Sequence, residues 1–177
     1  MEISIIVLQS LDGFIARSHS DNLSWATRAD RDFFIAKTTE IGNIIMGSTT
    51  FNNMKGIKGT AFKDRNVVVM TSKPEDYAGY KNEFVKSIQF LSGDTNTIVK
   101  HLELQGVKRV AVVGGGKVFY QFLNSCIVDD LYVTVSPHIF GTGIPLCDGE
   151  LINLKMDLID VRNISQNEIV LHYKITH

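Results

Sequence analysis

The three consecutive glycines Gly114–Gly116 are the residues whose type and spacing most clearly suggest a binding site. They follow a β-branched run at Val107–Val113 and precede a helical pattern at Lys117–Asn124. A strand that enters a helix through glycines lets a ligand approach the backbone, and the free N–H groups of a helix N-terminus favour an anion. The pattern predicts a site for the pyrophosphate of a nucleotide. The alternative is that the glycines serve only close packing of a helix on a strand.

The spacing of these glycines excludes two common phosphate motifs. The run does not read Gly-x-Gly-x-x-Gly, and no Gly-Lys-Ser/Thr follows a four-residue gap from a first glycine. The strand also lies late in the chain, whereas the Rossmann fingerprint occupies the first βα turn. We therefore expect a different α/β architecture.

Two further strand ends carry hydroxyl and amine groups. One is Gly47–Thr50, which reads Gly-Ser-Thr-Thr, and the other is Thr71–Lys73, which reads Thr-Ser-Lys. If the strands are parallel, all three turns lie at the carboxyl edge of the sheet, where α/β folds bind ligands. Together they offer amides, hydroxyls and two lysines to a dinucleotide. Alternatively, the first turn only caps a helix and the second is only a polar turn.

Composition bounds the classes of function. The 177 residues include 18 Lys and Arg against 19 Asp and Glu, with a net charge of −1 and no basic stripe for nucleic acid. Apolar runs such as Ile3–Leu8 are too short to cross a membrane, and the first residues lack the form of a signal peptide. Cys126 and Cys147 show no metal or disulfide spacing, so we expect no metal and a reducing cytoplasm, with both thiols in the core or at its boundary.

Alternating strand and helix patterns predict one α/β domain over residues 1–177. Strands are expected at Ile3–Leu8, Asn43–Met46, Asn66–Met70, Val85–Leu91, Val107–Val113 and Asp130–Ser136, and helices at Thr27–Glu40, Ser48–Met54, Thr95–Gln105 and Lys117–Asn124. Gln9–Ser24 is expected to be a long polar loop, and Leu151–Val161 with Glu168–Lys174 a closing antiparallel pair. The predicted fold is a central, mostly parallel sheet with an antiparallel C-terminal edge and helices on both faces.

With these segments assembled, the chain resembles the dihydrofolate reductase superfamily, most closely its single-domain branch related to the riboflavin-biosynthesis reductase. The matching segments occur in family order and are Ser10–Ala16, Trp25 with Asp30, Ile45–Phe51, Asn66–Ser72, Val113–Phe119 and Leu131–Thr134. The resemblance covers Ile3 to about Leu146 and is weak after that. It implies the superfamily fold, a reductase that uses NADPH, a small-molecule substrate and a homodimer.

The resemblance also implies which residues form the site. Those expected to bind the cofactor are Leu8, Ile15, Ala16, Gly47, Ser48, Thr49, Thr50, Thr71, Ser72, Lys73, Val113, Gly114, Gly115, Gly116, Lys117, Val118 and Phe119. Those expected to bind the substrate are Ile6, Trp25, Asp30, Phe34, Met54 and Thr134. Ser48 stands where relatives usually carry arginine, so preference for NADPH over NADH rests mainly on Thr71, Ser72 and Lys73.

Asp30 is the candidate catalytic residue. The implied reaction transfers a hydride from a nicotinamide to a C=N bond or a ribose-derived imine carbon, and such an addition needs a proton at nitrogen. Asp30 can supply it directly or through a water. Alternatively, Asp30 only stabilises a helix that Thr27 caps, because a carboxylate in a first turn complements the helix dipole.

The residues expected to contact the substrate resemble dihydrofolate reductases in some positions and the riboflavin-type branch in others. Asp30 and Thr134 match the pair that holds the pterin ring in dihydrofolate reductases. Asp64 stands where those enzymes carry the arginine for the folate glutamate, and Arg65 is adjacent but one residue out of register. Ser10–Ala16 and Ser136–Leu146 look more like the riboflavin-type branch. We expect a ribosylated aminopyrimidine as substrate; the alternatives are a true dihydrofolate reductase and a nucleotide-binding module without catalysis.

Overall fold

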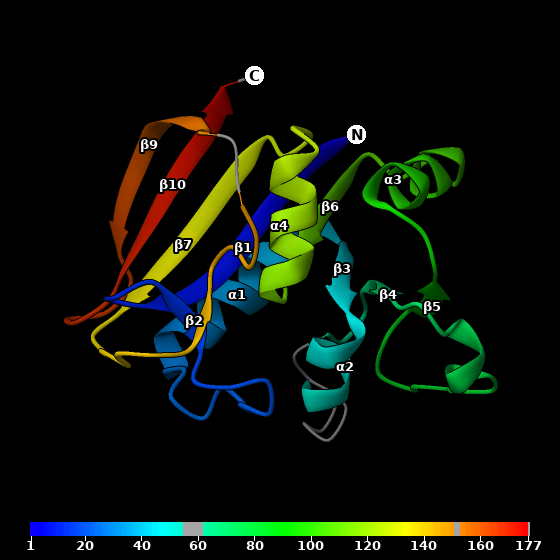
Figure 1. The fold of residues 1–177 in the computed structure, drawn as a ribbon, viewed down its shortest axis with the longest axis horizontal. Helices are drawn as coiled ribbons and strands as arrows, with labels where there is room; N and C mark the ends of the chain where they lie inside the picture. The colour runs from blue at the N-terminus through cyan, green and yellow to red at the C-terminus, as the bar shows by residue number, and fades with distance from the viewer. Residues whose placement is uncertain (55–61, 151–152, 177) are drawn as a thin grey trace.

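The computed structural model describes residues 1–54, 62–150 and 153–176 (Figure 1). Its first half contains β1 (Glu2–Ser10), β2 (Phe14–Ala16), α1 (Arg28–Ile41), β3 (Asn43–Gly47), α2 (Ser48–Met54), β4 (Asn66–Met70), a 3₁₀ turn (Pro74–Tyr77) and β5 (Ser87–Leu91). Its second half contains α3 (Thr95–Leu104), β6 (Arg109–Val112), α4 (Gly116–Asn124), β7 (Asp130–Ser136), β8 (Ile144–Pro145), β9 (Lys155–Asn163) and β10 (Ile169–Thr176).

The main sheet has eight strands in the order β5-β4-β3-β6-β1-β7-β10-β9. The first six of these strands run parallel to one another, and β10 pairs antiparallel with both β7 and β9. The predicted mostly parallel sheet with an antiparallel C-terminal edge is confirmed. The carboxyl ends of β1, β3, β4, β6 and β7 therefore share one edge, at the bottom of Figure 1.

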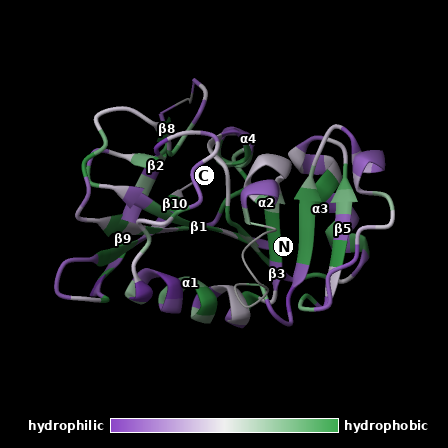
Figure 2. Cartoon of the chain, turned by 90° about the horizontal axis from the view of Figure 1, so that it is seen from below, coloured by the Kyte–Doolittle hydropathy of each residue, from purple (hydrophilic) through white to green (hydrophobic). Residues whose placement is uncertain are grey.

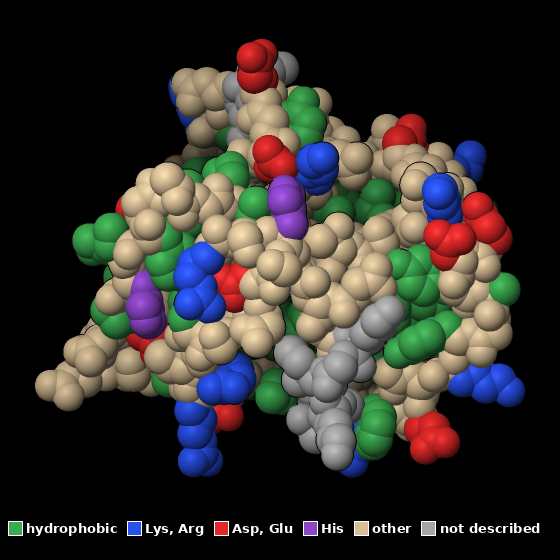
Figure 3. Space-filling model, turned by 60° about the horizontal axis from the view of Figure 1, so that its bottom comes forward, with side chains coloured by type: hydrophobic (Ala, Val, Ile, Leu, Met, Phe, Trp, Pro, Cys, Tyr) green, Lys and Arg blue, Asp and Glu red, His purple; other side chains and the backbone are tan. Residues whose placement is uncertain are grey.

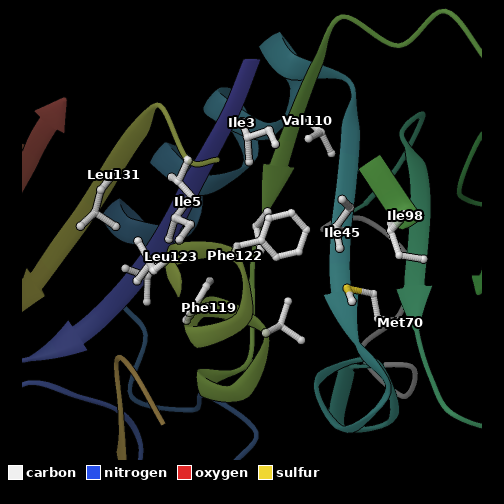
Figure 4. Close-up of a cluster of buried hydrophobic side chains, with 14 of the residues drawn as sticks. Ile3, Ile5, Ile45, Met70, Ile98, Val110, Phe119, Phe122, Leu123 and Leu131 are labelled. Atoms are coloured by element: carbon white, nitrogen blue, oxygen red, sulfur yellow. The ribbon is translucent and has the colours of Figure 1, made fainter. Parts of the chain in front are cut away.

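Helices cover both faces of the sheet (Figure 2). On one face, α4 places Phe119, Phe122 and Leu123 against alternate residues of β1 and β6, such as Ile5 and Val110 (Figure 4). On the other face, α1 packs on a smaller cluster. Because side chains alternate along a strand, the same strand supplies both clusters. The strands are apolar on both sides, as buried parallel strands must be.

The structure corrects several predicted boundaries. Gln9–Ser24 is not only a loop, because β2 within it pairs with β8 as a second, two-stranded sheet. The strands predicted at Val85–Leu91 and Val107–Val113 are shorter and begin at Ser87 and Arg109. Of the strand predicted at Leu151–Val161, residues 151–152 lie outside the described residues, and β9 begins at Lys155.

The two cysteines differ in their surroundings. Cys147 is half-buried and packs against the core, as expected, but Cys126 is exposed and was wrongly placed in the core or at its boundary. No helix of the described ranges is long and apolar enough to serve as a membrane span. The same ranges contain no group of His, Cys, Asp and Glu side chains that could ligate a metal.

Candidate active site

The three glycine- and hydroxyl-rich turns lie side by side at the carboxyl edge of the sheet. They end the neighbouring strands β4, β3 and β6. The amide of Gly47 donates to the carbonyl of Gly114 at 2.8 Å, so the first and third turns are bonded directly. Gly47 also pairs with Met70, which precedes the second turn. The sheet therefore brings together the groups that the sequence predicted for a dinucleotide.

The glycine turn is open at one position and closed at another. A Cβ on Gly115 would meet only the Thr50 hydroxyl, at 3.2 Å. A Cβ on Gly116 would lie 2.8 Å from the carbonyl of Pro145 and 3.1 Å from Asp148. Gly116 is thus required by the packing of residues 144–148 over the start of α4. Gly115 leaves the space that a ligand would need.

Helix α4 directs its N-terminus toward the same edge. Gly115 is its N-cap, and the amides of Val118 and Phe119 both donate to the Gly115 carbonyl. The first amides of a helix have no intrahelical partner and favour an anion. The Val118 and Phe119 side chains, like that of Ile15, lie in the core, so only their backbones could face a cofactor.

The second turn is polar and open to solvent. Ser72 and Lys73 are exposed, and the Lys73 amide donates to the Thr71 hydroxyl at 3.2 Å. The face on which the parallel strands end carries charges of both signs without a patch of one sign (Figure 3). Any preference for an added phosphate would therefore come from a few local groups rather than from a long-range field.

Asp30 lies in the first turn of α1, on the opposite face of the sheet from α4, and its side chain is buried. Thr27 caps α1, and its hydroxyl accepts from the Asp30 amide at 3.2 Å, as predicted. The Asp30 side chain is only 7% exposed, and the nearby Thr134 hydroxyl acts to lower the pKa of its carboxyl. Thr134 is paired with Leu8 on β1. The structure therefore joins the carboxyl and the hydroxyl that the sequence grouped.

Burial makes Asp30 a candidate proton donor near neutral pH. Loss of solvent raises the pKa of the Asp30 carboxyl to about 6, and the nearby charge of Glu168 also raises it. The Thr134 hydroxyl and Arg31 act in the opposite direction but are outweighed. A carboxyl that carries a proton close to the working pH is suited to general acid catalysis.

The other predicted substrate residues lie on several elements, and some of them contribute to the core. Ile6 and Phe34 share the apolar cluster beneath α1. Trp25 is 8% exposed, and its ring meets those of His138 and Phe140 edge-on, at 5.7 and 5.0 Å. Met54 is half-buried at the end of α2, which packs on β3 and β4.

Asp12 ties two loops together instead of facing an open pocket. It accepts from the Ser10 hydroxyl at 2.6 Å and from the amides of Phe140 and Gly141. These hydrogen bonds lower the pKa of Asp12, the Ser10 bond most strongly. The carboxylate therefore holds the Ser10–Ala16 loop against the loop that carries the aromatic partner of Trp25.

Two buried charged residues of this region were not recognised from the sequence as parts of the site. Glu168 is 2% exposed, and its Oε2 accepts from the Thr27 hydroxyl at 2.5 Å. Arg65 is 1% exposed, and its Nη2 donates to the Ile35 carbonyl at 2.8 Å. A glutamate that precedes a strand and an arginine beside an acidic turn carry no local signature of burial. Only the apolar strand that follows each of them hints at it.

The comparisons with known proteins identify the family and the fold. The model of the RibD C-terminal domain family matches residues 2–170. The chain belongs to this family. Over 96% of the chain and 95% of the relative, it is 22% identical to the uncharacterized protein YwjB of Bacillus subtilis (strain 168).

Two solved structures place the family fold in context. One is a diaminohydroxyphosphoribosylaminopyrimidine deaminase/5-amino-6-(5-phosphoribosylamino)uracil reductase from Thermotoga maritima, with a TM-score of 0.81 and 20% identity. That match covers 99% of this chain but only 56% of the Thermotoga chain. The other is the dihydrofolate reductase of Enterococcus faecalis complexed with NADP(H), with a TM-score of 0.65, 22% identity and coverage of 99% and 97%. At these identities the likeness shows a dihydrofolate reductase-like fold.

Proposed function

We propose that the protein is an NADPH-dependent reductase that transfers a hydride to a small heterocycle, of the ribosylated aminopyrimidine type. The observation that carries the proposal is the buried Asp30–Thr134 pair, which lies two strands from the glycine turn at the same edge of one sheet. A proton source and an anion-binding turn are the two protein parts that such a reduction needs. Membership of the RibD C-terminal domain family supports the reaction class.

The three turns would hold the cofactor. Gly47–Thr50 and Gly114–Lys117 would receive the pyrophosphate through backbone amides and hydroxyls. Thr71–Lys73 would receive the 2′-phosphate, with Lys73 as the cation. When bound, the nicotinamide supplies a hydride; the residues of the chain orient the reactants and provide the proton. The NADP(H) complex of the Enterococcus enzyme supports this choice of cofactor at the level of the fold.

Asp30 and Thr134 would recognise the substrate ring. A carboxyl beside a hydroxyl can hold a 2-amino-4-oxo ring edge by paired hydrogen bonds. That edge is common to pterins and to 2,5-diaminopyrimidines, so the pair fits both substrate classes. In either case Asp30 would also give a proton to the ring nitrogen or imine nitrogen that is reduced.

Dihydrofolate is the second candidate, because the same pair and the Enterococcus neighbour favour it. The disposition of Arg65 speaks against it. Its guanidinium also donates to the Thr39 hydroxyl at 2.5 Å and to the Lys63 carbonyl at 3.1 Å, and the side chain is almost fully buried. Asp64 is exposed and would repel a glutamate carboxylate. We therefore propose weak or no turnover of dihydrofolate.

The test is steady-state oxidation of NADPH and of NADH, with dihydrofolate and with the phosphoribosylated pyrimidine of riboflavin synthesis as substrates. The proposal expects faster turnover of the pyrimidine, with NADPH preferred. Efficient turnover of dihydrofolate would make the protein a dihydrofolate reductase. NADPH binding without oxidation by either compound would favour a nucleotide-binding module.

A further inference from the structure

Glu168 is a buried carboxylate that the proposed reaction does not use. It lies just before β10, and its side chain is 2% exposed. Oε2 accepts from the hydroxyls of Thr27, at 2.5 Å, and Ser165, at 3.2 Å. Among the described residues, Oε1 has no hydrogen-bond partner although it is buried. A carboxylate kept in so dry a place is costly to the fold, which points to a role beyond packing.

Thr27 joins Glu168 to Asp30. The single hydroxyl proton of Thr27 is donated to Glu168, and a lone pair of the same oxygen accepts from the Asp30 amide. Thr27 therefore cannot also donate to the Asp30 carboxylate. Glu168 thus fixes the direction of the Thr27 hydroxyl proton at the cap of the helix that carries Asp30.

The charge of Glu168 raises the pKa of Asp30. Within the described ranges, the charged groups that act on Asp30 are Glu168, which raises its pKa, and Arg31, which lowers it. From the sheet side Asp30 meets the uncharged Thr134, whose neighbour across β1 is Leu8. Two carboxylates in one buried region repel, so ionisation of one favours the proton on the other.

We propose that Glu168 is a positioning residue that keeps the proton on Asp30 for delivery to the substrate. This inference rests on the proposed function. As the hydride reaches carbon, the C=N double bond becomes a single bond, and nitrogen forms a new N–H bond with the Asp30 proton. Asp30 is left as a carboxylate and is reprotonated by water. The charge of Glu168 favours the proton on Asp30 before the reaction, so that it is in place for the transfer.

The decisive variant is Glu168→Gln, which keeps the shape and an acceptor for Thr27 but removes the charge. Carbon-13 NMR of the Asp30 carboxyl, without cofactor or substrate, should show its titration moved to lower pH by about one unit. The pH profile of kcat with the pyrimidine should move the same way, so that kcat falls about tenfold on the alkaline side. The KM for NADPH should stay unchanged. The matched control is Glu83→Gln at an exposed site, which should shift neither the Asp30 titration nor the pH profile of kcat.

The wild-type protein gives a second measurement that does not depend on the folding of a variant. The Glu168 carboxyl resonance should shift through the pH range in which Asp30 titrates, because the two groups are coupled. An unmoved Asp30 titration in Glu168→Gln, or a flat Glu168 resonance, overturns the inference whatever the turnover. A moved titration in a protein that reduces no pyrimidine supports the action of Glu168 on Asp30 and overturns the proposed function.

Discussion

The carboxyl edge with its three turns and the buried cluster of Asp30, Thr27, Thr134 and Glu168 lie against one sheet but are built in opposite ways. The edge uses backbone amides and small side chains from segments that are each continuous in sequence, such as Gly114–Lys117. The Asp30 cluster uses carboxyl and hydroxyl groups from distant segments, and Thr27 and Glu168 are 141 positions apart. The first region presents preformed backbone dipoles, and the second raises the pKa of an acid by excluding water.

The largest expected effect is at the carboxyl edge, where Gly115→Val should greatly weaken NADPH binding. The φ of Gly115 is −94°, which any residue adopts, so the variant should fold. The branched side chain would fill the approach path beside Thr50 and remove hydrogen bonds to the pyrophosphate, raising the Kd for NADPH by about 100-fold. Fluorescence titration with NADPH measures it.

The control for that change is Gln121→Val on the exposed surface of the same helix, α4. It introduces the same side chain away from the edge and should leave NADPH affinity unchanged. Equal affinities for Gly115→Val and the wild type would contradict the placement of the pyrophosphate at the glycine turn.

The second effect is on the free energy of unfolding and concerns the buried carboxyl of Asp30. The pKa of Asp30 rises from 3.8 to about 6 on folding, so protonated Asp30 favours the folded state. Its contribution to stability is complete below pH 3.8. That contribution is lost as pH rises through about 6. Asp30→Asn removes the buried charge and should therefore raise the free energy of unfolding by roughly 2 kcal/mol at pH 8, with little gain at pH 4.

Urea unfolding at the two pH values measures the difference. Asp32→Asn, an exposed carboxylate on the same helix, is the control and should show no such pH-dependent gain. A destabilised Asp30→Asn variant at pH 8 would mean that the Asp30 carboxylate makes contacts that outweigh the cost of its burial.

The smallest effect concerns the Thr71–Lys73 turn and distinguishes NADPH from NADH. Lys73→Ala should weaken NADPH about fivefold and leave NADH almost unchanged, because an exposed cation contributes little and only the 2′-phosphate meets it. Lys86→Ala, another exposed lysine, should change neither affinity. Equal losses for both cofactors in Lys73→Ala would show that Lys73 does not distinguish them.

The same contrast explains what the sequence could predict. The fold and the three turns could be predicted from the sequence because each turn directly follows an apolar strand within one continuous segment. The Thr27 cap was accessible for the same reason and is confirmed. The β2–β8 pair was missed, since β8 has only two residues and its partner lies more than a hundred positions earlier. Glu168 was missed because its burial depends on α1 packing from the other end of the chain.

The sequence also could not assign Arg65. A one-residue difference in register decides whether a side chain faces α1, and the strand pattern alone does not fix where that strand begins. In the structure Asp64 occupies a turn with φ +64°, and Arg65 is directed to the carbonyl of Ile35. Its burial gives a physical reason to favour the smaller pyrimidine over dihydrofolate that the sequence did not contain.

In the proposed reaction the carboxyl edge binds the cofactor and Asp30 provides the proton. The most direct test is Asp30→Asn, assayed separately for NADPH affinity and for turnover of the phosphoribosylated pyrimidine. We predict a Kd for NADPH within about twofold of the wild type and a kcat lower by at least about 100-fold. An Asp30→Asn variant that keeps its kcat, or one that loses NADPH affinity and turnover together, would contradict the account.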